Sequence, residues 1–275
     1  MAYPIADWDD AYANGPHIPD GMSYPGPWLA PAQAFRDAMA AQGRARLDLA
    51  YGPGARNRLD LFAPARAARG LLVFVHGGFW KALDKSVWSH FARGAAEAGW
   101  NVAIPSYTLA PAARIADITR EVAAAIACAA GEVKGDIVLA GHSAGGHLVT
   151  RMISETSPLA PALVARIARV TSISGLHDLR PLLNTMLNAD LRLDAAEARA
   201  ESPALLAPLP GRDLTCWVGA DERPEFIRQN HVMADMWMGF DAKVRCVVEP
   251  GRHHFDVIEG LREAGHPLLA AVLGG

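Results

Sequence analysis

A serine between two glycines, in Gly141-His142-Ser143-Ala144-Gly145, follows the apolar run 136–140 and precedes a segment with helical periodicity. This order predicts a sharp strand-to-helix turn, in which the glycines leave room for the backbone and the hydroxyl is presented at the end of a strand. A serine held in this way is typical of a nucleophile. Because Ser143 stands at the start of a helix, the Ala144 N–H is a candidate donor to a developing oxyanion.

Tandem glycines provide a second candidate for oxyanion binding. They occur in His76-Gly77-Gly78-Phe79-Trp80, directly after the apolar run 70–75. Without side chains, successive N–H groups can face a carbonyl oxygen, and such donors stabilise the charge that develops in acyl transfer. We assign Gly78 and Phe79 as the donors, with Gly77 as the other candidate.

A serine nucleophile needs a base, and in the α/β-hydrolase fold the chain order is serine, acid, histidine. His253 and His254 follow the last predicted strand through Pro250-Gly251. We choose His254 because the residues after it, 255–258, resemble a helix start that would fix its ring. His231 lies in a helical pattern and is expected to be a surface or packing residue.

Two adjacent carboxylates, Asp221 and Glu222, are candidates for the acid. They follow the predicted strand 214–218. In many α/β-hydrolases the acid stands three residues after the glycine that ends this strand, here Gly219, which favours Glu222. Asp221 is the commoner residue type for the role and remains the alternative, and the carboxylate that is not used would cap a helix or be solvated.

The elements that must position these residues alternate between strand and helix patterns from about residue 46 onward. Apolar strands alternating with helices imply βαβ units and a mainly parallel, twisted sheet with helices on both faces. We therefore predict an α/β class chain with the α/β-hydrolase fold and eight strands. The predicted strands are 46–50, 58–62, 70–75, 101–107, 136–140, 169–174, 214–218 and 243–248, and the predicted helices are 31–42, 86–99, one capped by Asp117, 145–154 and 224–238.

Two segments fall outside this alternation. Residues 1–45 are rich in proline, glycine and aromatics and are predicted to form an arm or cap, and residues 176–212 a helical insertion. The insertion could cover a pocket, or it could be a peripheral loop with a small core of its own. Both segments are assigned to a single domain that spans residues 1–275.

Composition excludes several classes of function. The 275 residues carry a net charge of −3, so no basic surface for nucleic acid is expected, and no apolar run is long enough to span a bilayer. The N-terminus has no signal-peptide pattern, which favours a cytoplasmic location. Cys128, Cys216 and Cys246 lack metal-site spacing and are predicted to be reduced, mostly buried thiols. We expect no metal and no organic cofactor.

Six motifs together resemble the kynurenine formamidase (arylformamidase) branch of the hormone-sensitive-lipase-like α/β-hydrolases. The resemblance implies Ser143 as nucleophile, His254 as base and Glu222, where the family more often has Asp, as acid. It also implies hydrolysis of an N-formylkynurenine-type aryl formamide. The motifs are HGGFW at 76–80, SYTLAP at 106–111, GHSAGGHL at 141–148, GLHDLRPLL at 175–183, ERPEF at 222–226 and HFDVIE at 254–259.

Acyl transfer leaves the substrate open, because an aryl formamidase and a general short-chain carboxylesterase or thioesterase use the same machinery. Trp80 and Tyr107 flank the expected site, where each could stack on an aromatic leaving group or serve as a core aromatic. The intact Ser-acid-His set argues against a third alternative, a non-enzymatic receptor on this fold. The expected partner is a small ester or formamide, and a homodimer is an open alternative to a monomer.

Overall fold

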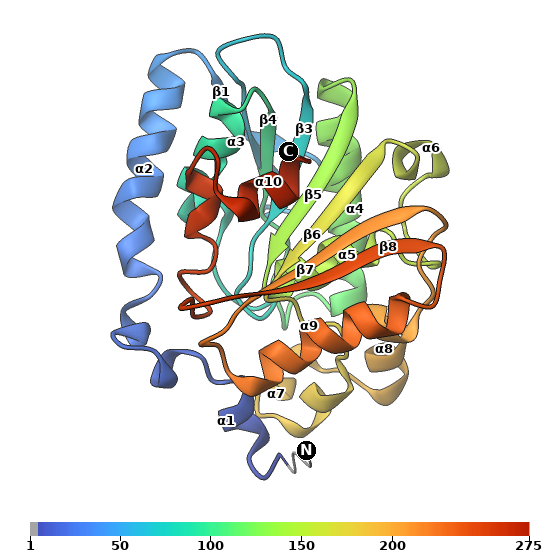
Figure 1. The fold of residues 1–275 in the computed structure, drawn as a ribbon. Helices are drawn as coiled ribbons and strands as arrows, with labels where there is room; N and C mark the ends of the chain where they lie inside the picture. Colours follow the sequence, from blue (N-terminus) through green and yellow to red (C-terminus); the bar gives the residue numbers. More distant parts are fainter. Residues whose placement is uncertain (1–4, 275) are drawn as a thin grey trace.

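The chain folds around an eight-stranded sheet with the order β1-β2-β4-β3-β5-β6-β7-β8. A computed structural model describes residues 5–274. β2 pairs antiparallel with β1 and with β4, and the remaining neighbours are parallel (Figure 1). The predicted fold class and strand number are therefore confirmed. The strands are β1 Ala45–Ala50, β2 Arg58–Phe62, β3 Gly70–Val75, β4 Asn101–Pro105, β5 Asp136–His142, β6 Ile167–Ile173, β7 Arg212–Gly219 and β8 Ala242–Glu249.

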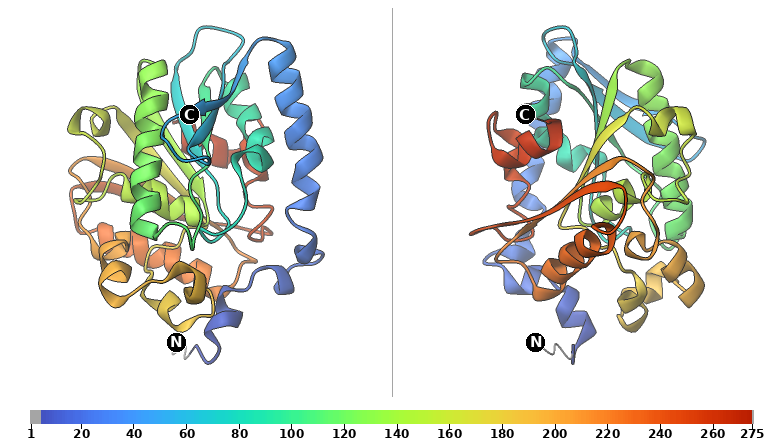
Figure 2. Two further views of the ribbon diagram at one scale, coloured as in Figure 1. Left: turned by 180° about the vertical axis from the view of Figure 1, so that it is seen from behind. Right: turned by 45° about the vertical axis from the view of Figure 1, so that its right-hand side comes forward.

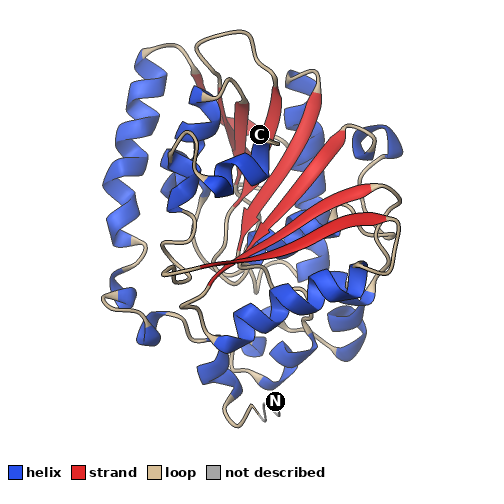
Figure 3. Cartoon of the chain, viewed as in Figure 1, coloured by secondary structure: helices blue, strands red, loops and turns tan. Residues whose placement is uncertain are grey.

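Helices cover both faces of the sheet (Figure 3). The α-helices are α1 Trp8–Tyr12, α2 Gly26–Ala41, α3 Arg93–Glu97, α4 Ile115–Glu132, α5 Ala144–Arg151, α6 Pro161–Val164, α7 Asn188–Leu191, α8 Ala195–Ala200, α9 Pro224–Trp237 and α10 Pro267–Leu273. The 3-10 helices are η1 Gly15–His17, η2 Gly21–Ser23, η3 Lys85–Ala92, η4 Arg180–Asn184, η5 Pro203–Leu205 and η6 Glu259–Arg262.

Strand β3 shows why the core has two halves. Its six residues are all buried, and alternate side chains point to opposite faces of the sheet. Leu71 and Val73 join one apolar cluster with α4, α5 and α9, whereas Leu72 and Phe74 join a second cluster with α2, η3, α3 and α10. The two opposite views show α4 and α10 on different sides of the sheet (Figures 1 and 2). A strand buried on both faces is the reason that its sequence is continuously apolar.

Three predicted helix starts are wrong. In place of the predicted helix 86–99, the chain forms η3 followed by α3. The first of these begins at Lys85, because the Asp84 side chain caps it by accepting the Ser86 N–H. Helix α4 starts at Ile115, so that Asp117 accepts the Arg114 N–H from the third helical position instead of standing at the cap. The stretch 255–258 forms turns that lead into η6, because Asp256 accepts the His253 N–H and closes a local loop.

One further boundary and the burial of the thiols also differ from expectation. Helix α2 starts at Gly26, five residues before the predicted start, since Trp28 anchors its first turn in the core. All three cysteines are free, but only Cys216 is buried. Cys246 is half-buried because it lies on the edge strand β8, and Cys128 is half-buried on α4.

The arm runs from residue 5 to the start of α2 and packs against distant parts of the chain. Helix α1 lies against α9 and η4 (Figure 1). The Tyr12 hydroxyl donates to Glu225 Oε1 at 2.8 Å, and Arg223 pairs with Asp10. Farther along, the ring of Tyr24 stacks on Phe255 at 4.7 Å between centroids. The arm is therefore fixed to the carboxyl-end side of the sheet, where the candidate site lies.

Candidate active site

Ser143 occupies the sharp turn between β5 and α5. Its backbone has φ 55° and ψ −118°, a strained conformation for a residue with a side chain. The turn needs glycine on both sides: a Cβ on Gly145 would stand 1.9 Å from the Val75 oxygen, and one on Gly141 would stand 2.2 Å from the Gly145 oxygen. The Ser143 hydroxyl consequently lies at the carboxyl end of the sheet, as the sequence pattern predicts.

His254 and Glu222 form a buried pair. The His254 Nδ1–H donates to Glu222 Oε2 at 2.7 Å, and both residues are almost fully enclosed. The other carboxylate oxygen accepts the Gly219 N–H at 2.9 Å and the hydroxyl of Ser174. A carboxylate held by three donors fixes the imidazole with Nε2 as its free basic nitrogen.

Asp221, the alternative acid, is exposed to solvent. Its backbone N–H donates to the Arg252 oxygen at 2.9 Å. Glu222, the next residue, is buried and points toward His254. The geometry thus brings Glu222, and not Asp221, to His254.

His142 contacts both the backbone and the ring of the candidate base His254. Its Nε2–H donates to the His254 backbone oxygen at 2.8 Å, and the two rings lie 4.6 Å apart between centroids. Burial, together with the neighbouring His254, holds the pKa of His142 well below its ordinary value. A neutral His142 leaves His254 free to accept a proton without an adjacent positive charge.

The predicted oxyanion loop passes close to Ser143. Gly78 has φ 112°, and a Cβ there would stand 2.4 Å from the Ala82 oxygen, so the turn requires glycine. Gly78 and Phe79 line the same cavity as Ser143, whereas Gly77 packs against the His142 oxygen and Ser143 Cβ. Among residues 5–274, no hydrogen-bond partner is found for the backbone N–H groups of Gly78, Phe79 and Ala144. These three donors are therefore free to bind an oxygen.

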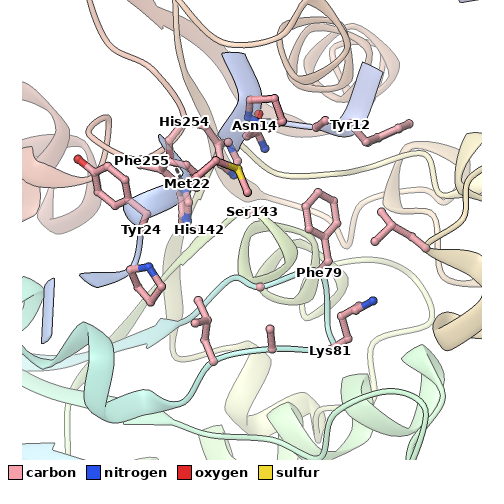
Figure 4. Close-up of a pocket in the computed structure, with 18 of the residues that line it drawn as sticks. Tyr12, Asn14, Met22, Tyr24, Phe79, Lys81, His142, Ser143, His254 and Phe255 are labelled. Atoms are coloured by element: carbon pink, nitrogen blue, oxygen red, sulfur yellow. Dashed lines mark hydrogen bonds between the residues drawn. The ribbon is translucent and has the colours of Figure 1, made fainter. Parts of the chain in front are cut away.

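A cavity of about 810 Å³ opens above Ser143 and His254 (Figure 4). The arm supplies a large part of its wall, and the insertion supplies Met186, Leu187 and Asp190. The wall is mainly apolar and aromatic, as is usual for small-molecule sites. The arm residues that line it are Asp9, Tyr12, Ala13, Asn14, Gly15, Pro16, Met22, Tyr24 and Pro25. The other lining residues include Trp28 of α2, Gly78, Phe79, Lys81, Ala82, Leu83, Trp88, His142 and Phe255.

Trp80 and Tyr107 do not form part of this wall, and of the two roles predicted for them the structure shows that of core aromatics. Both side chains are fully buried. The Trp80 Nε1–H donates to His147 Nδ1 at 3.3 Å, and the Tyr107 hydroxyl donates to the His76 oxygen at 3.0 Å. The positive φ of Phe79 and Trp80 turns the loop so that Phe79 faces the cavity and Trp80 the core. Phe79 is the aromatic residue of this loop that faces the site.

Sequence reasoning missed two parts of the site. Ser174, at the end of β6, donates to Glu222, and its place just before Gly175 at a strand end was the available signal. The arm residues gave no such signal, because nothing in their spacing shows which distant loop they cover. Among the described residues, no group of three or more His, Cys, Asp or Glu side chains could hold a metal ion, and no helix is long and apolar enough to cross a membrane.

Comparisons with known proteins show the family and the fold of the chain. A family described as alpha/beta hydrolase fold matches residues 72–256. A curated relative from Salmo salar, named kynurenine formamidase, is 27% identical over 240 residues, which cover 82% of this chain and 80% of the relative. The resemblance drawn from the motifs is thereby confirmed.

Two solved structures show the same fold. A protein from Silicibacter sp. TM1040 with the provisional name thioesterase is 48% identical, with a TM-score of 0.92. The match covers 97% of this chain and 98% of that protein's chain. Esterase B from Lactobacillus rhamnosis is 16% identical, with a TM-score of 0.68, and the match covers 90% of this chain and 94% of the esterase chain. At that identity the second structure supports the fold alone.

Proposed function

Because this chain belongs to the alpha/beta hydrolase fold family, we propose that it is a serine hydrolase in which Ser143, His254 and Glu222 form the catalytic triad. The observation that carries the proposal is the buried 2.7 Å contact between His254 and Glu222 beside the strained Ser143 turn, with Gly78 and Phe79 on the same cavity as Ser143. Nucleophile, oriented base and oxyanion donors are the parts that acyl transfer needs.

The proposed reaction has two halves. His254 Nε2 takes the proton from Ser143 Oγ as the oxygen attacks the carbonyl carbon, and the oxyanion is bound by the N–H groups of Gly78, Phe79 and Ala144. His254 then gives its proton to the leaving alcohol or amine as the bond to the acyl carbon breaks. Water attacks the acyl-serine, passes a proton to His254 and releases the acid with Ser143 restored.

The proposed substrate is a small acyl ester or an aryl formamide of the N-formylkynurenine type. Support comes from the relatives named kynurenine formamidase and from the aromatic side chains of Tyr24, Phe79 and Phe255 on the cavity wall, which suit a planar aryl group. A second candidate is a general short-chain esterase or thioesterase, which the 48% identical protein with the provisional name thioesterase favours.

Steady-state kinetics on three probes separate these candidates. We expect purified protein to hydrolyse N-formylkynurenine with a kcat/KM at least equal to that for p-nitrophenyl acetate and for a short acyl thioester. If kcat/KM for the formamide is more than about a thousandfold below that for the esters, a difference of about 4 kcal/mol in transition-state stabilisation, the formamidase assignment is wrong and the second candidate stands.

A further inference from the structure

Asn14 is a buried amide without a partner on the wall of the active-site cavity. The residue is 6% exposed, and neither Nδ2 nor Oδ1 has a hydrogen-bond partner among residues 5–274. It lies on the arm at the start of η1, where its side chain makes no capping bond. Buried polar groups are normally paired, and an unpaired one is unfavourable in the folded state. An amide in this position therefore needs a reason other than stability.

Several other polar groups of the arm and cavity mouth are already engaged. The Tyr12 hydroxyl donates to Glu225, Lys81 pairs with Asp190, and Asp9 accepts the Met186 N–H at 2.7 Å. Among the described residues of the wall, Trp28 and Trp88 also carry a buried indole N–H without a partner, and His142 a buried Nδ1, but each of these atoms can only donate or only accept. Asn14 is the buried wall residue whose unpaired side chain can do both, and it borders the same cavity as Ser143 and His254 (Figure 4). Rotation about its last side-chain bond is soft, so either amide atom can turn toward a ligand.

The charges around the cavity indicate what kind of group Asn14 can bind. Lys81 is paired with Asp190, and Asp9 adds a further negative charge to the wall, so these lining residues supply no unpaired lysine that would direct an anionic group to Asn14. A carboxamide edge is neutral and presents a donor and an acceptor side by side, so that it matches both atoms of the Asn14 amide.

We propose that Asn14 is a specificity subsite that binds a neutral donor–acceptor group, of carboxamide type, on the substrate at a distance from the acyl carbon that Ser143 attacks. The proposal rests on the proposed serine hydrolase function. Two hydrogen bonds at a site shielded from water would favour substrates that carry such a group, because an analogue that lacks it leaves the amide unpaired.

Paired substrates test this directly. The 3- and 4-carbamoylphenyl acetates are compared with the matching acetylphenyl acetates, in which a methyl group replaces the NH₂ donor with little change in shape. The measured quantity is the ratio of kcat/KM for carbamoyl over acetyl within each protein. Comparing this ratio between variants cancels the intrinsic reactivity of the two esters.

Two substitutions at Asn14 are expected to affect this ratio differently. Asn14→Leu removes both hydrogen-bonding atoms and is expected to lower the ratio by about tenfold for at least one isomer pair. Asn14→Asp keeps an acceptor for the NH₂ group and is expected to retain the preference. Asp20→Asn, elsewhere on the arm and outside the cavity wall, is the matched control and should leave the ratio unchanged.

Stability provides a second readout. Replacing an unpaired buried amide by an apolar side chain of similar size should leave the thermal midpoint of Asn14→Leu equal to or above that of the wild type. The proposal is overturned if the ratio does not change in Asn14→Leu for either isomer pair. It is also overturned if both substrates lose activity equally, because that result indicates a role in the fold of the arm or in oxyanion binding.

Binding measurements distinguish failure of this proposal from failure of the proposed function. In a Ser143→Ala background, calorimetry should give a Kd for the carbamoylphenyl acetates that Asn14→Leu weakens by about tenfold. If Ser143→Ala still turns over both esters, the serine mechanism fails while the Asn14 ratio remains measurable. If turnover stops but Asn14→Leu does not change the Kd, the subsite alone is wrong.

Discussion

The strand ends and the arm contribute to the active site in different ways. At the strand ends, Glu222 has three donors, His254 has Glu222 and His142 beside it, and Ser143 is held by glycines. On the arm, by contrast, Asn14 has no partner. The frame formed by Ser143, His254, Glu222 and their supports at the strand ends is suited to chemistry that tolerates no movement. The irregular segment that covers it carries a group left free for a ligand.

Replacing the acid should give the largest difference between neighbouring residues. Glu222→Gln keeps the size of the side chain but loses the charge that holds the His254 tautomer, and kcat should fall by about 10³- to 10⁴-fold. Asp221→Asn, one residue away and exposed, should change kcat by less than about threefold. Steady-state kinetics on p-nitrophenyl acetate measure both, and a larger loss for Asp221→Asn would reverse the assignment of the acid.

Substitution of Gly78 tests whether the loop that lines the cavity beside Ser143 binds the oxyanion. Gly78→Ala places a Cβ against the Ala82 oxygen at a positive φ, so the loop must shift and kcat should fall by about 10²- to 10³-fold. Gly131→Ala is the control, since a Cβ at Gly131 meets nothing within 4 Å. If Gly78→Ala is as active as the control, the loop does not bind the oxyanion.

Tyr12 tests whether the arm acts on binding more than on chemistry. Tyr12→Phe removes the hydrogen bond to Glu225, and we expect KM to rise by roughly 3- to 10-fold while kcat changes less than about twofold. Tyr51→Phe is the matched control, because its hydroxyl donates to the Ser106 oxygen away from the cavity. A fall in kcat at constant KM would show that the arm helps to place the reacting groups.

The smallest effect concerns acid stability of the frame. Burial lowers the pKa of His147 to about 3, whereas in the unfolded chain it is about 6.5. The unfolded state therefore binds a proton first as the pH falls, and the free energy of unfolding should drop by about 1 kcal/mol at pH 5.5 for this residue. In urea titrations His147→Asn should show a shallower decline between pH 7 and pH 5.5, and an unchanged decline would contradict the assignment.

The sequence was sufficient to predict the frame because local rules determine it. A continuous apolar strand, a glycine-flanked serine and the chain order of serine, acid and histidine each follow from short stretches. Even the choice of Glu222 over Asp221 came from counting three residues past Gly219. The start of α4 was wrong because Asp117 can stabilise a helix from inside its first turn as well as from the cap.

The arm could not be predicted in the same way. Tyr12 forms a hydrogen bond with Glu225, which lies 213 residues away in the sequence. Asn14 follows α1 directly and lies on the cavity wall because α1 packs on α9. No periodicity in residues 5–28 encodes these contacts. The sequence left two roles open for Trp80 for a related reason: the positive φ values of Phe79 and Trp80 decide which ring faces the cavity, and the residue types alone do not show this.

Covalent labelling of Ser143 tests the central claim most directly. The protein is treated with a p-nitrophenyl phosphonate ester, and intact and peptide mass spectrometry then locate the adduct. The triad described here predicts one phosphonyl group per chain, on Ser143, with loss of esterase activity in step with labelling and no adduct in Ser143→Ala. An active protein that carries no adduct at Ser143, or that is inactivated by labelling elsewhere, would contradict it.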